Sequence, residues 1–352
     1  MKYMPGQQIY KYQLIQKIGG GEFGEVWTAN DNAIMTRLAV KLLDQAHCSI
    51  DERLLEAQIG NRLIHPNVVN IRNADVVNIG SPEGPIVIIA MPFYQNGSAA
   101  SKINSANFLD LDKALKCLTD VLRGLEYLHE NGYYHCDIKP QNILVGEHGE
   151  YVITDYGITC HSPTHTAVSP RSLYLPHAAA ESITYNRYDV RTDIYQLGLT
   201  AFRLINGIST IKDEFAKDRE AFKQKILDGK VVADTDFQPF VPRKLRRIIL
   251  KACSANPEER FQSALEMRRE LERINLNGGT ATSNEHGRIT ILKKRYAYFF
   301  ETAVKAKKCI AFMAFKENLT SHRITRVAEY SCQVKNLKDI KNAAQRFFLD
   351  LL

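Results

Sequence analysis

Eleven residues near the middle of the chain combine a carboxylate, an ammonium and an amide: Tyr134-His135-Cys136-Asp137-Ile138-Lys139-Pro140-Gln141-Asn142-Ile143-Leu144. Asp137 and Asn142 are five positions apart, with Lys139 between them. Phosphoryl transfer requires a carboxylate that orients a hydroxyl, a cation that neutralises phosphoryl charge, and an oxygen ligand for Mg²⁺. A second carboxylate follows in Thr154-Asp155-Tyr156-Gly157, after a short strand-like run. The two segments together predict a phosphotransferase site.

The same two segments resemble the catalytic loop and the Asp-Phe-Gly motif of the eukaryotic-like, bacterial-type Ser/Thr protein kinases. Asp-x-Lys-Pro-x-Asn is typical of Ser/Thr kinases, whereas tyrosine kinases usually have Ala-Ala-Arg or Arg-Ala-Ala between the same Asp and Asn. The resemblance implies ATP and Mg²⁺ as cofactors and a protein Ser or Thr hydroxyl as the acceptor. It also implies that Asp137 accepts or orients the acceptor proton and that Lys139 neutralises the moving phosphoryl group. Asn142 and Asp155 would hold Mg²⁺.

A glycine-rich segment near the N-terminus lies between two stretches with strand character. Its spacing, G-x-G-x-x-G-x-V, provides six residues predicted to contact the nucleotide: Ile18, Gly19, Gly20, Gly21, Gly24 and Val26. Glycine has no Cβ, so the backbone there can approach phosphate oxygens closely. Taken alone, the motif fits a glycine hairpin without a ligand about equally well. A dinucleotide-binding fold would require a helix next, and the sequence continues instead as strand.

Lys41 lies within an alternating apolar stretch, where an ammonium is unfavourable unless it meets an anion. Without further context, it would also suit an edge strand from which its ammonium reaches solvent. The resemblance implies that Ala39 contacts the nucleotide and that Lys41 binds its phosphates. It further implies that a glutamate on the helix predicted over 49–63 pairs with Lys41. Glu56 is the better placed glutamate, and Glu52 is the competing one.

The apolar run 86–91 predicts a strand that is buried on both faces. By resemblance, Met91 is the gatekeeper at the back of the adenine pocket. Pro92 stands where most kinases have Glu, and it keeps the carbonyl that would accept from the adenine amino group. The amide of Tyr94 would donate to the adenine ring. Leu144 completes the predicted cofactor-binding set.

Helical spacing over 110–131 predicts the helix that leads into the catalytic loop. The resemblance implies that Asp193 accepts backbone N–H bonds from this loop. A carboxylate near a helix N-terminus would also suit the helix dipole at the same position. Glu181 and Arg260 match a buried ion pair of the family, which closes the activation segment.

Two departures from the family pattern occur beside the catalytic residues. Cys136 stands where many members have Arg, and that Arg normally pairs with a phosphorylated activation segment. We therefore expect activity that does not require phosphorylation of the segment 158–180. Tyr156 replaces the usual Phe before Gly157, so its hydroxyl requires a partner.

The chain changes character after residue 275. Residues 276–286 have the composition of a linker, and residues 287–352 predict a small basic domain with an antiparallel sheet and one helix. The strands are expected over 288–292, 296–304, 308–315 and 322–334, and the helix over 337–352. Residues 281–352 hold 14 Lys/Arg and 6 Asp/Glu, a net charge of +8, whereas the rest of the chain holds 32 and 33. This charge could serve an acidic protein or nucleic acid, of which nucleic acid is the less expected partner, and a solvated basic face is the default expectation. We expect this domain to pack on the preceding lobe, because such a small unit is marginal alone.

Together these patterns predict an α+β fold class. A bilobal protein kinase fold over 9–275, with a β-rich N-lobe (about 9–94) and a helical C-lobe (about 95–275), precedes the small domain. The predicted function is a cytoplasmic Ser/Thr protein kinase that transfers the γ-phosphoryl group of ATP. Two alternatives remain open: a pseudokinase scaffold that binds nucleotide or a partner, and a small-molecule kinase of the aminoglycoside type. No stretch is apolar enough for a membrane span, and seven scattered cysteines without a C-x-x-C pair favour a reducing compartment.

Overall fold

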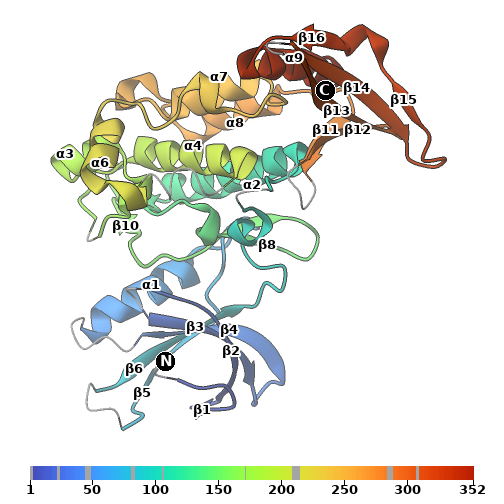
Figure 1. Ribbon diagram of the computed structural model, residues 1–352. Coiled ribbons are helices and arrows are strands. Elements are labelled where there is room, and N and C mark those ends of the chain that lie inside the picture. The colour runs from blue at the N-terminus through green and yellow to red at the C-terminus, as the bar shows by residue number, and fades with distance from the viewer. Residues whose placement is uncertain are drawn as a thin grey trace.

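A computed structural model shows two lobes and a C-terminal sheet (Figure 1). The structure describes residues 3–21, 24–43, 49–80, 84–104, 107–170, 172–207, 215–283, 288–306 and 309–352. In Figure 1 the N-terminal sheet lies at the bottom in blue, the helical lobe lies above it, and the C-terminal sheet lies at the upper right in red. The predicted α+β class and the bilobal architecture are confirmed.

The N-lobe contains a six-stranded antiparallel sheet in the order β1-β2-β3-β4-β6-β5. Its strands are β1 (Gln8–Ile9), β2 (Tyr12–Gly21), β3 (Gly24–Asp31), β4 (Thr36–Leu43), β5 (Asn73–Val77) and β6 (Ile86–Pro92). The two faces of the sheet differ because side chains alternate along each strand. Trp27, Val40 and Ile88 belong to a buried apolar cluster on one face. Lys41 therefore points to the opposite face, toward the helical lobe.

Helix α1 (Ile50–Arg62) follows β4 along the chain and contacts β5 and β6. Ser49 caps its N-terminus: the Ser49 hydroxyl accepts from the Glu52 amide, and the Glu52 carboxylate accepts from the Ser49 amide. This reciprocal capping box determines where the helix begins. Glu56 comes one turn later and is buried.

The C-lobe is built around two long helices, α2 (Leu111–Glu130) and α4 (Val190–Asn206), which contact each other. Shorter helices surround them: α3 (Ala180–Tyr185), α6 (Arg219–Leu227), α7 (Arg243–Ala252) and α8 (Ala264–Glu272). Two small antiparallel pairs carry the loops of the site: β7 (Tyr133–Tyr134) with β10 (Cys160–His161), and β8 (Ile143–Val145) with β9 (Tyr151–Ile153).

Helix α2 ends where the sequence predicted, at Asn131 and Gly132. Gly132 has φ +74°, and a Cβ there would lie 2.8 Å from the Ser162 carbonyl oxygen. Glycine is therefore required both by the turn and by the close approach of the activation segment. The turn leads the chain into β7 and the catalytic loop.

The C-terminal region forms an antiparallel sheet with one helix, as expected. Its elements are β11 (Gly279–Ser283), β12 (Ile289–Lys293), β13 (Tyr296–Ala306), β14 (Cys309–Asn318), β15 (Ile324–Arg326), β16 (Cys332–Val334) and α9 (Leu337–Leu351). Phe300 packs on Phe312 of the neighbouring strand and on Phe348 of α9. These aromatic side chains are continuous with the core of the helical lobe. The expected packing of this region on the C-lobe is confirmed.

Two details differ from the sequence-based expectation. Residues 279–283, inside the predicted linker 276–286, form β11, which pairs with β12 along its whole length. Linker composition did not reveal this strand because its Gly, Thr and Ser residues are also turn formers. The strand predicted over 322–334 is divided into β15 and β16, which pair with different parts of β14.

Candidate active site

The buried ammonium of Lys41 lies between two carboxylates. Lys41 Nζ donates to both carboxylate oxygens of Glu56, at 2.9 and 2.8 Å, and to Asp155 Oδ1 at 2.8 Å. Glu52 instead takes part in the capping of α1. The structure thus brings together β4, α1 and the loop after β9, which are far apart in the sequence.

Electrostatics favour the charged forms of Lys41 and Asp155. Burial alone would lower the pKa of Lys41, but Asp155 and Glu56 outweigh it and raise this pKa. Burial would raise the pKa of Asp155, but the Lys41 ammonium outweighs it and lowers the pKa to about 2. Burial raises the pKa of Glu56, and Lys41 opposes that shift. At neutral pH Asp155 is therefore a carboxylate held beside a cation.

Asp137, Lys139 and Asn142 form one hydrogen-bonded group. Lys139 Nζ lies 2.6 Å from Asp137 Oδ2, and Asn142 Nδ2 donates to the same oxygen at 2.8 Å. Asn142 Nδ2 also donates to the Asp137 carbonyl at 2.9 Å. Asp137 Oδ1 is buried and has no hydrogen-bond partner among the residues that the structure describes. This oxygen is available to accept from a hydroxyl brought to the site.

Helix α4 fixes the backbone of the catalytic loop through two polar side chains. Asp193 is fully buried; its Oδ1 accepts from the Cys136 amide at 2.8 Å and its Oδ2 from the His135 amide at 2.9 Å. One turn further along α4, Gln196 accepts from the Ile138 amide and donates to the Cys136 carbonyl, both at 2.8 Å. The predicted role of Asp193 toward the catalytic loop is confirmed.

The predicted nucleotide-contacting residues of the N-lobe share one face of its sheet. Residues directly opposite each other in an antiparallel ladder point to the same side. Gly19 is opposite Val26, Val26 is opposite Lys41, and Ala39 is opposite Met91. Because Ala39 and Lys41 are two positions apart on β4, all five residues face the helical lobe.

The glycine-rich hairpin connects β2 to β3. Gly20 is opposite Glu25, and Gly21 is opposite Gly24, whose φ of +124° favours glycine. A Cβ on Gly24 would lie 2.2 Å from the Leu42 carbonyl oxygen, so glycine is also required by packing against β4. Ile18 lies exposed on β2 beside this hairpin. The tip of the hairpin, residues 22 and 23, lies outside the described residues.

The connection between the lobes runs from Pro92 at the end of β6 through Tyr94. The Gly97 carbonyl then accepts from the Val145 amide at 2.9 Å, and Ser98 forms a bridge with Leu144. Leu144 therefore lies on the C-lobe side at this connection. Burial raises the pKa of Tyr94. Of the predicted adenine-pocket residues, Pro92 and Tyr94 thus lie on this connection and Leu144 is paired with it through Ser98.

The buried hydroxyl of Tyr156 has the hydrogen-bond partner that it requires. The hydroxyl donates to the Val69 carbonyl at 2.5 Å, and burial raises the pKa of this phenol well above its usual range. Its ring lies against α1, where a Cβ on Gly60 would be 2.9 Å from Tyr156 Cε2. The small residue on α1 thus makes room for the ring next to Asp155.

The end of the activation segment is fixed by buried charges. Arg260 donates to both carboxylate oxygens of Glu181, at 2.7 and 2.8 Å, and its guanidinium lies 4.8 Å from the centre of the Tyr195 ring. The predicted Glu181–Arg260 pair is confirmed. Nearby, His177 contacts Arg203 through Nε2 and the Ile138 carbonyl through Nδ1, at 3.0 Å for the latter.

Three residues that contact the catalytic loop were not predicted. Gln196 clamps the loop, His177 supports the Ile138 carbonyl, and the Tyr174 ring lies 4.3 Å from Lys139 Nζ. The contact of Gln196 could have been predicted from its position three residues after Asp193. This spacing places both side chains on one face of an otherwise apolar helix. For the contacts of His177 and Tyr174 the sequence gave no signal, because the activation segment has no regular periodicity that would indicate where its side chains point.

The donor atoms suit a hard divalent cation bound with a nucleotide. The Asn142 amide nitrogen is turned toward Asp137, so its amide oxygen remains as the candidate ligand atom. The Asp155 side chain is 36% exposed and ionised, with one oxygen bonded to Lys41. A carboxylate and an amide oxygen are the ligand types that Mg²⁺ prefers, with phosphate and water oxygens completing its shell.

The bilobal fold, with a buried Lys–Glu pair above a loop containing Asp137 and Asn142, defines the protein kinase class. Sequence comparison agrees, because the protein kinase domain family matches residues 12–270. The chain belongs to this family.

The chain is similar in sequence to three bacterial members of the family. It is 27% identical to the serine/threonine-protein kinase PrkC of Bacillus subtilis, over 74% of this chain and 40% of the relative. It is 30% identical to PknD of Chlamydia trachomatis, over 75% of this chain and 31% of the relative. It is 28% identical to PknB of Mycolicibacterium smegmatis, over 75% of this chain and 43% of the relative. The match thus spans less than half the length of each of these proteins. Within the described part of the chain, every helix is too short or too polar to cross a lipid bilayer.

Proposed function

We propose that this chain is a Ser/Thr protein kinase that transfers the γ-phosphoryl group of Mg-ATP to a protein hydroxyl. The observation that carries the proposal is Asp137 Oδ1, a buried carboxylate oxygen without a hydrogen-bond partner in the described residues. The other oxygen of this carboxylate is bonded to the Lys139 ammonium and to the Asn142 amide nitrogen. An unsatisfied buried acceptor is unfavourable in a resting protein, so it is expected where a substrate donor binds. All three relatives described above are named serine/threonine-protein kinases.

Each group has a role that follows from its position. Asp137 orients the acceptor hydroxyl and takes its proton, while Lys139, 2.6 Å from that carboxylate, neutralises charge on the transferring group. Lys41 holds the phosphates and is itself positioned by Glu56. Asn142 and Asp155 would hold Mg²⁺, which would neutralise phosphate charge when bound.

The adenine would lie between the lobes, against the face that carries Val26, Ala39 and Met91, with Leu144 on the C-lobe side. The Pro92 carbonyl and the Tyr94 amide would form its hydrogen bonds. Gly19, Gly20, Gly21 and Gly24 would cover the phosphates, where a lack of Cβ permits close approach. Ile18 would lie at the edge of this cover.

The proposed partners are a protein that carries the Ser or Thr acceptor and an acidic partner of the basic C-terminal sheet. The Lys293 ammonium donates to the Leu351 carbonyl at 2.7 Å. One of its three N–H groups is therefore already bonded within the protein. Lys294 and Arg295 are exposed at the turn between β12 and β13. Two further lysines of this region, at positions 307 and 308, lie outside the described residues. A cytoplasmic location remains a prediction that rests on cysteine usage.

The test is incubation of the purified chain with labelled ATP and Mg²⁺, alone and with a lysate, followed by mass spectrometry. The expected result is label on Ser or Thr of protein. Nucleotide binding without any transfer would support the pseudokinase scaffold and contradict the proposal. Label on small metabolites alone would support a small-molecule kinase of the aminoglycoside type.

A further inference from the structure

Two cysteines lie together where the catalytic loop meets the start of the activation segment. Strand β7 pairs with β10, with Tyr134 opposite Cys160, and Cys136 follows two residues after Tyr134. Cys160 also packs against the buried apolar cluster that contains Cys136. The two thiols also donate to carbonyls of their own strands, Cys136 to Tyr134 at 3.3 Å and Cys160 to Ile158 at 3.6 Å.

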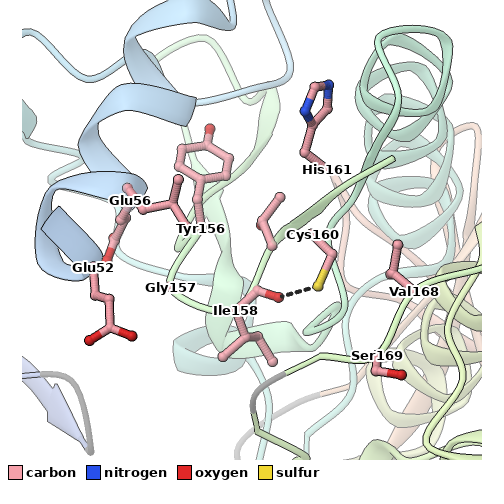
Figure 2. A pocket seen from close by; sticks show the side chains of 11 residues that line it. Glu52, Glu56, Tyr156, Gly157, Ile158, Cys160, His161, Val168 and Ser169 are labelled. Atoms are coloured by element: carbon pink, nitrogen blue, oxygen red, sulfur yellow. Dashed lines mark hydrogen bonds between the residues drawn. The ribbon is translucent and has the colours of Figure 1, made fainter. Parts of the chain in front are cut away.

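The two thiols differ in access. Cys136 is buried in an apolar cluster with Tyr134, Ile158 and Tyr188. Cys160 is half-buried and lines a cavity of about 250 Å³ between α1 and the activation segment. Figure 2 shows this cavity, with the Cys160 sulfur pointing to the Ile158 carbonyl. A small oxidant can therefore approach Cys160, with Cys136 positioned behind it.

We propose that Cys136 and Cys160 form a reversible disulfide when the protein meets hydrogen peroxide, linking the catalytic loop to the activation segment. The importance of this link rests on the proposed kinase function. In the family pattern an arginine at the Cys136 position holds a phosphorylated activation segment, and a covalent link would hold the segment at the same place.

The chemistry balances in two steps. The Cys160 thiol attacks peroxide, the O–O bond breaks, and Cys160 sulfenic acid and water form. The Cys136 sulfur then attacks the Cys160 sulfur, the S–O bond breaks, and the Cys136 proton leaves with hydroxide as a second water. The two thiols lose two electrons in total, and peroxide gains them. Cys160 lines the cavity and therefore meets the oxidant first, whereas the buried Cys136 acts in the second step.

The backbone around Cys136 is held on both sides. Its amide donates to Asp193 Oδ1 and its carbonyl accepts from Gln196 Nε2, both at 2.8 Å. The movement that closes an S–S bond of about 2.05 Å would therefore occur mainly in the activation segment near Cys160. The disulfide should fix the start of this segment without displacing Asp137. It closes a loop within the chain, so it should also stabilise the fold by restricting the unfolded state.

The test uses the full chain, first reduced, then treated with peroxide, quenched and alkylated. Digestion after glutamate separates the two cysteines into peptides 131–147 and 151–181, whereas trypsin would leave them in one peptide. We expect these two peptides to be cross-linked after peroxide and released by a thiol reductant. We also expect a melting temperature raised by a few degrees and slower proteolysis within residues 158–180, with phosphotransfer retained.

Matched variants separate this site from other thiols. Cys136→Ser and Cys160→Ser should each remove the cross-link, whereas Cys332→Ser, at an exposed cysteine of β16, should leave it intact. The proposal is overturned if Cys136 and Cys160 remain alkylatable in the wild-type chain at a peroxide dose that oxidises Cys332. It is equally overturned if either cysteine cross-links elsewhere. A cross-link in a chain that never transfers phosphate would refute the kinase proposal and leave the redox site standing.

Discussion

At the scale of single residues, Tyr156 shows how the chain accommodates a tyrosine beside Asp155. The phenol hydroxyl replaces a hydrogen atom of the family's usual Phe and finds the Val69 carbonyl at 2.5 Å. Tyr156→Phe should therefore retain phosphotransfer while lowering the free energy of unfolding by about 0.5–1.5 kcal/mol, the net value of one buried hydrogen bond. Urea unfolding would measure this change. Tyr185→Phe, at a tyrosine that is 75% exposed, is the matched control and should change stability by less. An unchanged midpoint for Tyr156→Phe would show that the bond contributes nothing.

Some residues of the candidate site could be predicted from the sequence, and others could not. The presence of Lys41, Asp137, Asn142 and Asp155 was evident from short motifs, because each motif fixes spacing within a few residues. The choice between Glu52 and Glu56 was less certain, because it depends on the rotation of α1. The Ser49 capping box sets where that helix starts, and it uses Glu52 for the cap. Only the structure placed Glu56 against Lys41.

At the scale of elements, the Glu181–Arg260 pair joins the end of the activation segment to the loop before α8. Arg260 is fully buried, and Glu181 is 12% exposed in its side chain. Glu181→Ala should lower the free energy of unfolding by about 3–5 kcal/mol, because it leaves a buried guanidinium without its carboxylate. Glu258 provides the matched control, since it pairs with Arg191 but its side chain is 74% exposed. Glu258→Ala should cost about 0–1 kcal/mol. Equal losses in the two variants, measured by chemical unfolding, would contradict this account.

His177 gives the activation segment a pH dependence. Arg203 is always a donor, so His177 Nε2 must accept from it, and Nδ1 must carry the proton that it donates to the Ile138 carbonyl. The ring is therefore neutral, and burial together with Arg203 and Lys139 lowers its pKa well below 6.5, while Ile138 and Gln196 oppose the shift. Its contribution to stability is present above about pH 6.5 and decreases as the pH falls, because the unfolded chain then binds a proton that the folded chain does not.

We expect the wild-type protein to lose up to about 1.4 kcal/mol of unfolding free energy for each pH unit below 6.5 through this one histidine. The measurement is the unfolding free energy from pH 8 to 5 for the wild type and for His177→Gln. The variant should show a shallower decrease. His148→Gln, at an exposed histidine, is the control and should follow the wild type. Parallel curves for all three proteins would contradict a neutral, buried His177.

At this scale the helices and strands with regular patterns were predictable, and the irregular segments were not. The continuous apolar run of β6 indicated burial on both faces, and the helical spacing of apolar residues in α2 indicated one buried face. The activation segment has no such period, and its contacts come from residues distant in the sequence, such as Arg203 and Gln196. Strand β11 was not predicted because its composition resembles that of a turn. It forms a strand because it pairs with β12.

At the scale of the whole molecule, the C-terminal sheet completes the surface of the helical lobe. Thr280 of β11 donates to Asp112 of α2 at 2.6 Å, and Ser283 Oγ accepts from the Phe108 amide at 3.2 Å. The apolar core runs without interruption from α2 into β14 and α9. The sequence predicted this packing from the small size of the unit, but not which helix it would meet.

A chain that ends at Asn275 should therefore have a lower melting temperature than the full chain. Its nucleotide affinity should remain within about twofold, because residues assigned to the nucleotide lie before position 156. Differential scanning calorimetry and a nucleotide titration would measure both quantities. A surface substitution of the same region, Lys294→Glu with Arg295→Glu, is the control and should leave the melting temperature nearly unchanged. An unaltered melting temperature after truncation would show that the sheet is an independent unit.

The account as a whole depends on Asp137 as the group that meets the acceptor hydroxyl. The most direct measurement compares phosphotransfer and nucleotide binding in the wild type, in Asp137→Ala, and in Asp51→Asn, an exposed carboxylate in the first turn of α1. The account predicts a loss of about 10²–10⁴-fold in transfer for Asp137→Ala, with nucleotide affinity within about twofold of the wild type and no change for Asp51→Asn. Retention of more than about a tenth of the activity by Asp137→Ala, against that expected loss, would contradict it.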